Sequence, residues 1–464
     1  STITPGTITN NGATASTDSP FDDTAGFKFG EGGDQNIIKC GSYVGTGSVG
    51  HKIELGWEPS FIIFKNTTDS GDNWEMVDVM RGNPASDGTT SQDANFLRAN
   101  TSGAEFTNRP FSPYSTGFEI RNAGGGSNGS GKNYIYMAIR RSDGYVGKPA
   151  EAGTDVFAMD TWITNGDPAM ISNFPVDFVL DRDPTVGSGW QADWHARGRL
   201  IQTKYLKTNG QDAENTGTWG YFDYNNGWLN RQGSNESNWQ SWMWKRHAGF
   251  DVATYVGNSG GDTSGDSQVI PHNLGKVPEM IWVKKRDGSG YWGVYHKGLN
   301  GGTNPADYRL LLNDTHAESV GGGTNSSWYW NDTLPTATQF SVGEIANANE
   351  NNKNLIALLF ASVDGISKVG SYTGNASSSG PTITLGFAPR FIIIKCASVG
   401  GTNWFVYDTL RGLTAGNDQR IFLNSNNSQT SADDIDPSAT GFQVVSTWDQ
   451  LNDNNATYIY YAHA

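Results

Sequence analysis

Short apolar runs separated by turn residues dominate the hydrophobic pattern of the chain. These runs are rich in Ile, Val and aromatic residues, and Gly, Asn, Asp, Ser or Pro bound them, which is typical of β-strands. The run from Phe61 to Phe64 is apolar at every position and predicts a central strand that is covered on both faces. No stretch of about 12 or more residues carries a helical stripe. The pattern therefore predicts an all-β protein.

The same pattern recurs four times along the chain. A proline-led strand marks each copy, at Pro59, Pro175, Pro278 and Pro389. The repeat of about 100–115 residues is too long for a propeller blade or a short-period solenoid. We therefore expect four tandem β-sandwich modules of a jelly-roll or lectin-like type. The expected units are an extended polar N-terminal arm and four modules, at residues 1–38, 39–149, 150–250, 251–368 and 369–464.

A tryptophan follows each proline-led strand at a nearly fixed distance, and Asp and Arg follow it in two copies. This signature comprises Trp74, Asp78 and Arg81, then Trp190 and Arg197, then Trp292, and finally Trp404, Asp408 and Arg411. The signature can be interpreted either as a ligand site or as a structural element. Because Trp194 and His296 replace the Asp in the second and third copies, we favour the structural role. We expect a carboxylate–guanidinium pair across a turn, a Trp ring under the Arg stem and a positive-φ glycine after the Arg.

Composition and charge exclude several classes of protein. The net charge of -15, without a basic run, gives no electrostatic footprint for nucleic acid. No apolar stretch approaches the roughly 20 residues of a membrane helix, so no membrane insertion is expected. Only 36% of the residues are hydrophobic, which predicts thin individual cores and further burial between modules and between chains.

Candidate chemistry is sparse. Two cysteines, Cys40 and Cys396, cannot form a disulfide framework, and the seven histidines show no metal-binding spacing. No nucleophile or nucleotide motif is present, and the spacing of the 47 acidic residues selects no glycosidase pair. We expect no cofactor, no metal and no enzymatic activity.

The second module holds eight of the 16 tryptophans of the chain. Trp219, Trp228 and Trp239 lie in Gly/Asn-rich stretches and are therefore candidates for a glycan-binding or subunit-contact surface, with plain packing as the equal alternative. Trp242 and Trp244 align with a core strand and are expected to be buried.

Several strings are similar to repeat modules of marine tailed bacteriophages, especially those of cyanobacteria. The strings are residues 249–258 (GFDVATYVGN), 270–284 (IPHNLGKVPEMIWVK), 143–149, 295–301, 361–370 and 460–464. The resemblance spans residues 37–464, and such modules occur in tail-fibre and other virion structural proteins. It implies a virion surface protein that is assembled in the host cytoplasm and contacts the host cell through a tail fibre or similar appendage.

The resemblance also implies partners. They are other virion proteins, further copies of the chain with a trimer favoured, and a host-surface glycan or protein. Alternatives are an architectural capsid-bound fibre, knob or decoration protein without a receptor role, a glycan-degrading tailspike, and a filament sheath.

Overall fold

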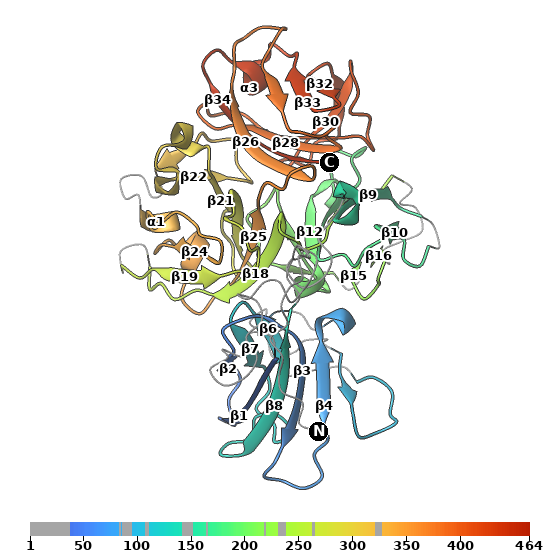
Figure 1. The fold of residues 1–464 in the computed structure, drawn as a ribbon, viewed down its shortest axis with the longest axis vertical. Coiled ribbons are helices and arrows are strands. Elements are labelled where there is room, and N and C mark those ends of the chain that lie inside the picture. The colour runs from blue at the N-terminus through green and yellow to red at the C-terminus, as the bar shows by residue number, and fades with distance from the viewer. Residues whose placement is uncertain are drawn as a thin grey trace, which may run out of the picture.

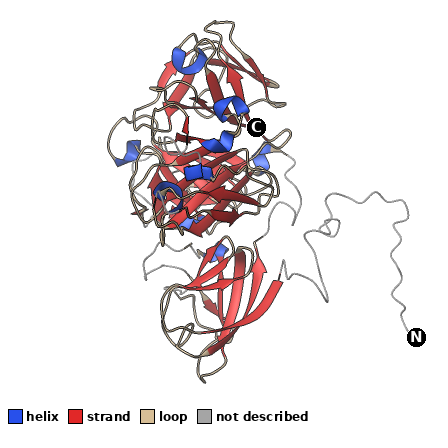
Figure 2. Ribbon diagram, turned by 90° about the vertical axis from the view of Figure 1, so that its left-hand side faces the viewer, coloured by secondary structure: helices blue, strands red, loops and turns tan. Residues whose placement is uncertain are grey.

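The computed structural model of the chain describes residues 38–82, 85, 95–106, 111–141, 152–163, 166–217, 220–230, 238–261, 265–320 and 327–464. The expected N-terminal arm, apart from Ile38, and the string at residues 143–149 lie outside the described residues. The fold is all-β, as predicted, and it consists of several antiparallel β-sandwich modules (Figure 2). Figure 1 shows module 1 at the bottom, module 2 at the right, module 3 at the left and module 4 at the top.

Module 1 is a five-stranded sheet packed on a three-stranded sheet. The larger sheet has the order β1 (Ile38–Val44), β8 (Asn133–Arg140), β3 (Pro59–Asn66), β4 (Glu75–Asp78), β5 (Leu97–Arg98). The smaller sheet has the order β2 (His51–Glu54), β7 (Gly117–Ile120), β6 (Phe111–Tyr114). Alternate residues of both sheets, such as Ile62, Phe64 and Phe118, form the core between them, as the period of two along a strand requires.

Modules 2 to 4 repeat this plan with one added strand in the larger sheet. In module 2 the sheet is β9 (Phe157–Thr161), β17 (Gln240–Trp244), β11 (Phe178–Arg182), β12 (His195–Gly198), β13 (Lys204–Lys207), β14 (Asn215–Thr216). In module 3 it is β18 (Phe250–Val256), β25 (Asn354–Phe360), β20 (Met280–Lys285), β21 (Gly293–His296), β22 (Tyr308–Leu311), β23 (Ser319–Val320). In module 4 it is β26 (Ser367–Thr373), β34 (Thr457–His463), β28 (Phe391–Cys396), β29 (Trp404–Asp408), β30 (Asp418–Phe422), β31 (Thr430–Ala432).

Each larger sheet of modules 2 to 4 carries a smaller sheet on its outer side. These small sheets are β10 (Met170–Ile171), β16 (Gly227–Asn230), β15 (Gly220–Tyr221) in module 2, β19 (Gln268–Pro271), β24 (Gln339–Val342) in module 3, and β27 (Thr382–Thr384), β33 (Gly441–Val444), β32 (Ile435–Ser438) in module 4. Among the described residues, modules 3 and 4 also contain short α-helices: α1 (Ser327–Trp330) and α2 (Ala346–Asn349) in module 3, and α3 (Asp449–Asn452) in module 4. Strand β18 begins one residue before the expected boundary of module 3 at residue 251. Strand β26 begins two residues before the expected boundary of module 4 at residue 369.

The second face of each six-stranded sheet packs against the same face of the other two. All residues of the central strands β11, β20 and β28 are buried, because one face meets the module's own core and the other meets a core shared by modules 2 to 4. This shared core is built from large side chains of all three modules, among them Trp242, Trp244, Trp282, Phe360, Phe391 and Tyr461. The expected burial between modules is therefore confirmed, and it lies at the centre of this three-module body.

Candidate functional site

The Asp–Arg pair of the sequence signature stabilises a turn, as predicted. Asp78 caps the 3₁₀-helix η1 (Val79–Arg81): its Oδ1 accepts the Arg81 amide N–H at 2.8 Å and its Oδ2 accepts Nε–H at 2.6 Å. Asp408 and Arg411 form the same pair, with distances of 2.9 and 2.7 Å. Gly82 and Gly412 follow with φ of 82° and 102°, conformations that favour glycine.

The tryptophans of the signature join different modules. Trp194, Trp292 and Trp404 are buried, and each indole N–H donates to a backbone carbonyl of the neighbouring module. The three bonds run from Trp194 to Phe422 (2.8 Å), from Trp404 to Leu311 (3.0 Å) and from Trp292 to Lys207 (2.9 Å). They run from module 2 to 4, from 4 to 3 and from 3 to 2, so they close a ring with pseudo-threefold symmetry.

The expected alignment of Trp190 is wrong. In three modules the backbone N–H of the signature tryptophan donates to an Asn side chain at the end of the next strand: Trp74 to Asn100, Trp292 to Asn313 and Trp404 to Asn424. In module 2, Trp194 makes this bond with Asn209 at 3.1 Å. Trp194 is therefore the counterpart, four residues after the expected position.

The expected ring under the arginine is also wrong. The ring under Arg411 is Trp242 of module 2, with its centroid 5.5 Å from Cζ, and the Trp242 indole donates to Asp408 Oδ2 at 2.9 Å. In module 2 the residue three positions before the arginine is Trp194 and not an acid, and Arg197 pairs with Asp181 on β11, Nε to Oδ1 at 3.0 Å. In module 4 the Asp–Arg pair therefore lies at the interface with module 2. In module 2 the arginine instead pairs with an acid on a neighbouring strand of its own sheet.

Equivalent backbone and cationic contacts close two further rings. The amides of Glu214, Glu318 and Gln429 donate at 2.7 Å to the carbonyls of Arg286, Ala397 and Pro184 in the next module. Arg182, Lys284 and Lys395 reach carbonyls of residues 425–427, Gln211 and Thr315 in the adjacent module. Burial lowers the pKa of Lys284 and of Lys395 to about 8. These groups serve as interface donors in the body of modules 2 to 4.

Of the two alternatives for the tryptophans of module 2, a binding surface and plain packing, the structure supports packing for Trp228 and Trp239. Trp228 and Trp239 are 0% exposed, and their indoles donate to Ser241 Oγ at 2.8 Å and to Asp181 Oδ2 at 2.9 Å. Trp228 lies on β16, which packs over the larger sheet to form the core of this module. Both rings are therefore core residues and cannot stack on a glycan. Trp219 lies outside the described residues.

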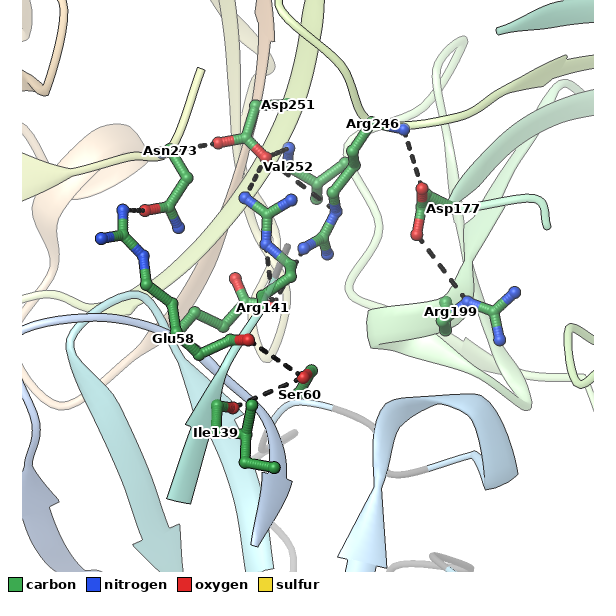
Figure 3. A network of polar contacts seen from close by, with 11 residues as sticks. Glu58, Ser60, Ile139, Arg141, Asp177, Arg199, Arg246, Asp251, Val252 and Asn273 are labelled. Atoms are coloured by element: carbon green, nitrogen blue, oxygen red, sulfur yellow. Dashed lines mark hydrogen bonds and ion pairs between the residues drawn. The ribbon is translucent and has the colours of Figure 1, made fainter. Parts of the chain in front are cut away.

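A buried ionic network joins module 1 to modules 2 and 3 (Figure 3). Arg141 Nη2 lies 2.6 Å from Asp251 Oδ1, and Arg246 Nη1 lies 2.9 Å from Glu58 Oε1. Burial alone would raise the pKa of Asp251, but Arg141 and Arg246 outweigh it and the pKa lies below its usual value. Because every charge in this network faces an opposite one, we interpret it as the joint that orients module 1.

Buried histidines offer no metal centre. Burial lowers the pKa of His247, His296 and His463 to about 3 in each case. His296 Nδ1 accepts the Gly298 amide N–H at 2.9 Å, so the proton is on Nε2, which lies 3.4 Å from the Tyr460 carbonyl of module 4. Among the described residues, no group of three or more His, Cys, Asp and Glu could hold a metal ion.

A polar hollow opens at the end of module 1 that points away from the other modules. Strands β3 and β8 meet modules 2 and 3 at Glu58 and Arg141, and their opposite ends lie at the bottom of Figure 1. The loops at this free end enclose a hollow of about 210 Å³. Its lining is polar: Asp72, Asn73, Glu75, Arg98, Asn122, Gly124, Gly126 and Ser127.

The side chains around the hollow are held in place by local contacts. Asn66 Nδ2 donates to Asp72 Oδ2 at 2.6 Å, and Arg98 Nε lies 3.7 Å from Glu75 Oε1. The Arg98 guanidinium also lies 4.3 Å from the ring centroid of Phe106. Carboxylate, amide and guanidinium groups that converge on one hollow can bind a hydroxyl-rich ligand. The lining residues come from two loops and from the ends of strands β4 and β5, so no local motif in the sequence marks them as one site.

No helix within the described ranges is long and apolar enough to cross a membrane. The family model of a domain of unknown function, DUF7483, matches residues 11–142 and 194–464. No curated protein matches the sequence.

Proposed function

The chain belongs to the DUF7483 family, and we propose that it is a non-enzymatic protein of the bacteriophage particle surface. It forms part of a tail fibre or similar appendage that contacts the host cell. The observation that carries the proposal is the tandem repeat, whose strings at residues 249–258 and 270–284 resemble marine phage virion modules. These strings supply residues of β18, β19 and β20. The resemblance thus lies in the scaffold, which suits a structural protein.

The closed body of modules 2 to 4 supports this role. Three equivalent indole bonds and one shared core fix these modules relative to one another. A rigid body of this kind transmits force without losing its shape. The net charge of -15 limits aggregation at high local concentration and favours contact with an acidic envelope through divalent cations.

We place the host contact at the polar hollow of module 1. It lies at a free end of the molecule, and it gathers Asp72, Asn73, Arg98 and Asn122 around a volume of about 210 Å³. Hydroxyl groups of a sugar pair well with such carboxylate, amide and guanidinium groups. A host-surface glycan is therefore the ligand that this hollow suits.

A purely architectural role is the second candidate, and one observation favours it. Trp228 and Trp239 are buried, which removes the aromatic surface that the receptor role relied on in module 2. In this alternative the chain is a capsid-bound fibre, knob or decoration protein without a receptor.

The test begins with purified particles of a phage that encodes the chain. We expect its peptides in the particles and its density on an outer appendage in electron cryomicroscopy. Recombinant chain should bind host cells and reduce phage adsorption. Asn122→Ala at the hollow should weaken both effects, and Asn454→Ala, an exposed site in module 4, should not.

The outcomes separate the candidates. Chain in the particle without binding to cells supports the architectural role. Release of oligosaccharides from the host envelope supports a glycan-degrading tailspike and contradicts the non-enzymatic proposal. Absence of the chain from the particles refutes the virion role altogether.

A further inference from the structure

Within the described residues, one face of the larger sheet of module 1 is apolar and uncovered. We name it the open face and define it by Phe61, Ile63, Trp74, Met76, Ile135 and Met137. These residues alternate with the core residues of β3, β4 and β8 and so point to the other side of the sheet. Trp74 is 37% and Ile135 is 40% exposed, and the other four are half-buried.

The strand register identifies the counterparts of the open face. Ile63 pairs with Met76 on one side and with Met137 on the other. The equivalent triplets are Leu180 with Ala196 and Trp242, Trp282 with Val294 and Leu358, and Ile393 with Val406 and Tyr461. All nine counterparts are buried in the core that modules 2 to 4 share. Of the four copies of this surface, the open face is thus the one that no described residue of the chain covers.

Modules 2 to 4 cannot cover the open face, because their equivalent faces are already packed against one another in the shared core. The three indole bonds run from module 2 to 4, from 4 to 3 and back to 2, which leaves no vacant place in the ring. Module 1 attaches through the other end of its strands, at the ionic network of Glu58 and Arg141. Exposed apolar faces of this kind mark interaction sites.

We propose that three copies of this chain associate through the open face, so that their first modules form the same threefold ring that modules 2 to 4 form within one chain. The module carries both halves of the ring contact. Trp74 holds the place of the indole donor, as its bond to Asn100 shows. The acceptors Lys207, Leu311 and Phe422 each lie two residues before the equivalent Asn, and in module 1 this position is Arg98.

Donor and acceptor on one module favour a closed ring over a twofold pair. In a head-to-tail contact, the Trp74 indole of one copy meets the Arg98 carbonyl of the next, and the rotation set by modules 2 to 4 closes after three copies. The Asp78–Arg81 pair borders the same face, and its counterpart Asp408 accepts an indole N–H from another module. This inference does not depend on the proposed function, since it rests on the internal symmetry of the chain alone.

The experiment measures the mass of the full chain by sedimentation equilibrium over a range of concentrations. We expect a trimer, three times the chain mass of 50.1 kDa. Ile135→Glu places a charge on the open face and should give a monomer. Trp74→Phe removes the indole donor and should weaken association about tenfold or more. Val269→Glu, at an exposed apolar strand position of module 3, is the matched control and should remain trimeric.

A second measurement uses Cys40, which is exposed and pairs with Met137 on the same sheet. Its alkylation should be slow in the wild-type trimer and fast in the Ile135→Glu variant, provided that thermal unfolding shows the variant to be folded. A wild-type monomer with a reactive Cys40 overturns the proposal. A monomer with a protected Cys40 also overturns it and identifies another segment of the same chain as the cover. A dimer, or a trimer that Ile135→Glu leaves intact, contradicts the proposed ring.

Discussion

The ring of indole bonds predicts that modules 2 to 4 unfold as one unit. We consider the change Trp292→Phe, which keeps an aromatic ring and removes the N–H that donates to the Lys207 carbonyl at 2.9 Å. Trp292 is 1% exposed, so water cannot replace the lost donor. The Lys207 carbonyl of module 2 then keeps only the longer bond from the Gly210 amide N–H, at 3.4 Å.

The magnitude follows from two contributions. Loss of the shorter bond to a buried acceptor costs about 1–3 kcal/mol. The missing part of the indole leaves a void of about 40 Å³, which at about 24 cal/mol per Å³ adds about 1 kcal/mol. The free energy of unfolding should therefore fall by about 2–4 kcal/mol. In a unit of this size about 2 °C corresponds to 1 kcal/mol, so the transition should move down by about 4–8 °C.

Differential scanning calorimetry of the full chain tests this reasoning. Trp194→Phe and Trp404→Phe should lower the same transition by similar amounts, because each removes one equivalent bond of the ring. Trp74→Phe, at the matching position of module 1, should leave that transition unchanged. If each of the three ring variants instead lowers a separate transition, the modules unfold independently and the cooperative ring is refuted.

Three further changes test other parts of the structure. Arg141→Met leaves Asp251 without its closest cation and should destabilise the joint of module 1 by about 3–5 kcal/mol; an unchanged calorimetric trace would contradict this role. Trp239→Ala should lower the free energy of unfolding by about 3–5 kcal/mol, because its ring lies in the core of module 2. A variant as stable as the wild type would instead indicate that the ring lies on the surface. His296 has a pKa of about 3 when folded, against its ordinary value of 6.5, so the unfolded chain binds the extra proton and stability falls as pH drops from 6.5 towards 3. His296→Gln should reduce this slope in urea denaturation by about 1.4 kcal/mol per pH unit, and an equal slope would show that the ring titrates normally.

Local periodicity was enough to predict the strands and their number of copies. Apolar runs bounded by turn residues predict the strands, and two covered faces are found for the central strands β11, β20 and β28. For Phe61 to Phe64 the expected second cover is wrong within the described residues, because Phe61 and Ile63 lie on the open face of module 1. Local sequence also predicts the Asp78–Arg81 and Asp408–Arg411 turns, because both partners lie within three residues. Contacts of this range are encoded in adjacent sequence.

Partners in other modules could not be predicted in the same way. Trp190 lies at the repeat distance from Pro175, and Trp194 lies four residues further on. Only the bond to Asn209 shows that Trp194 is the counterpart. Trp228 and Trp239 lie among Gly and Asn residues, which indicate exposure, but the stretch around Trp228 forms β16 and covers a sheet. Tertiary packing therefore overrides the local signal.

The joining of three modules in one chain explains why their equivalent positions have diverged. The position of Asp408 is occupied by Gly198 in module 2 and His296 in module 3. Identical subunits would have to place one residue in all three interfaces. Within one chain each interface can instead fit its own neighbour: Asp408 accepts the Trp242 indole, and His296 faces the Tyr460 carbonyl. Such a ring accepts its modules in a single order. When module 1 associates with identical copies of itself, all three interfaces have the same residues. Its open face must therefore carry both the Trp74 donor and the Arg98 acceptor on every copy.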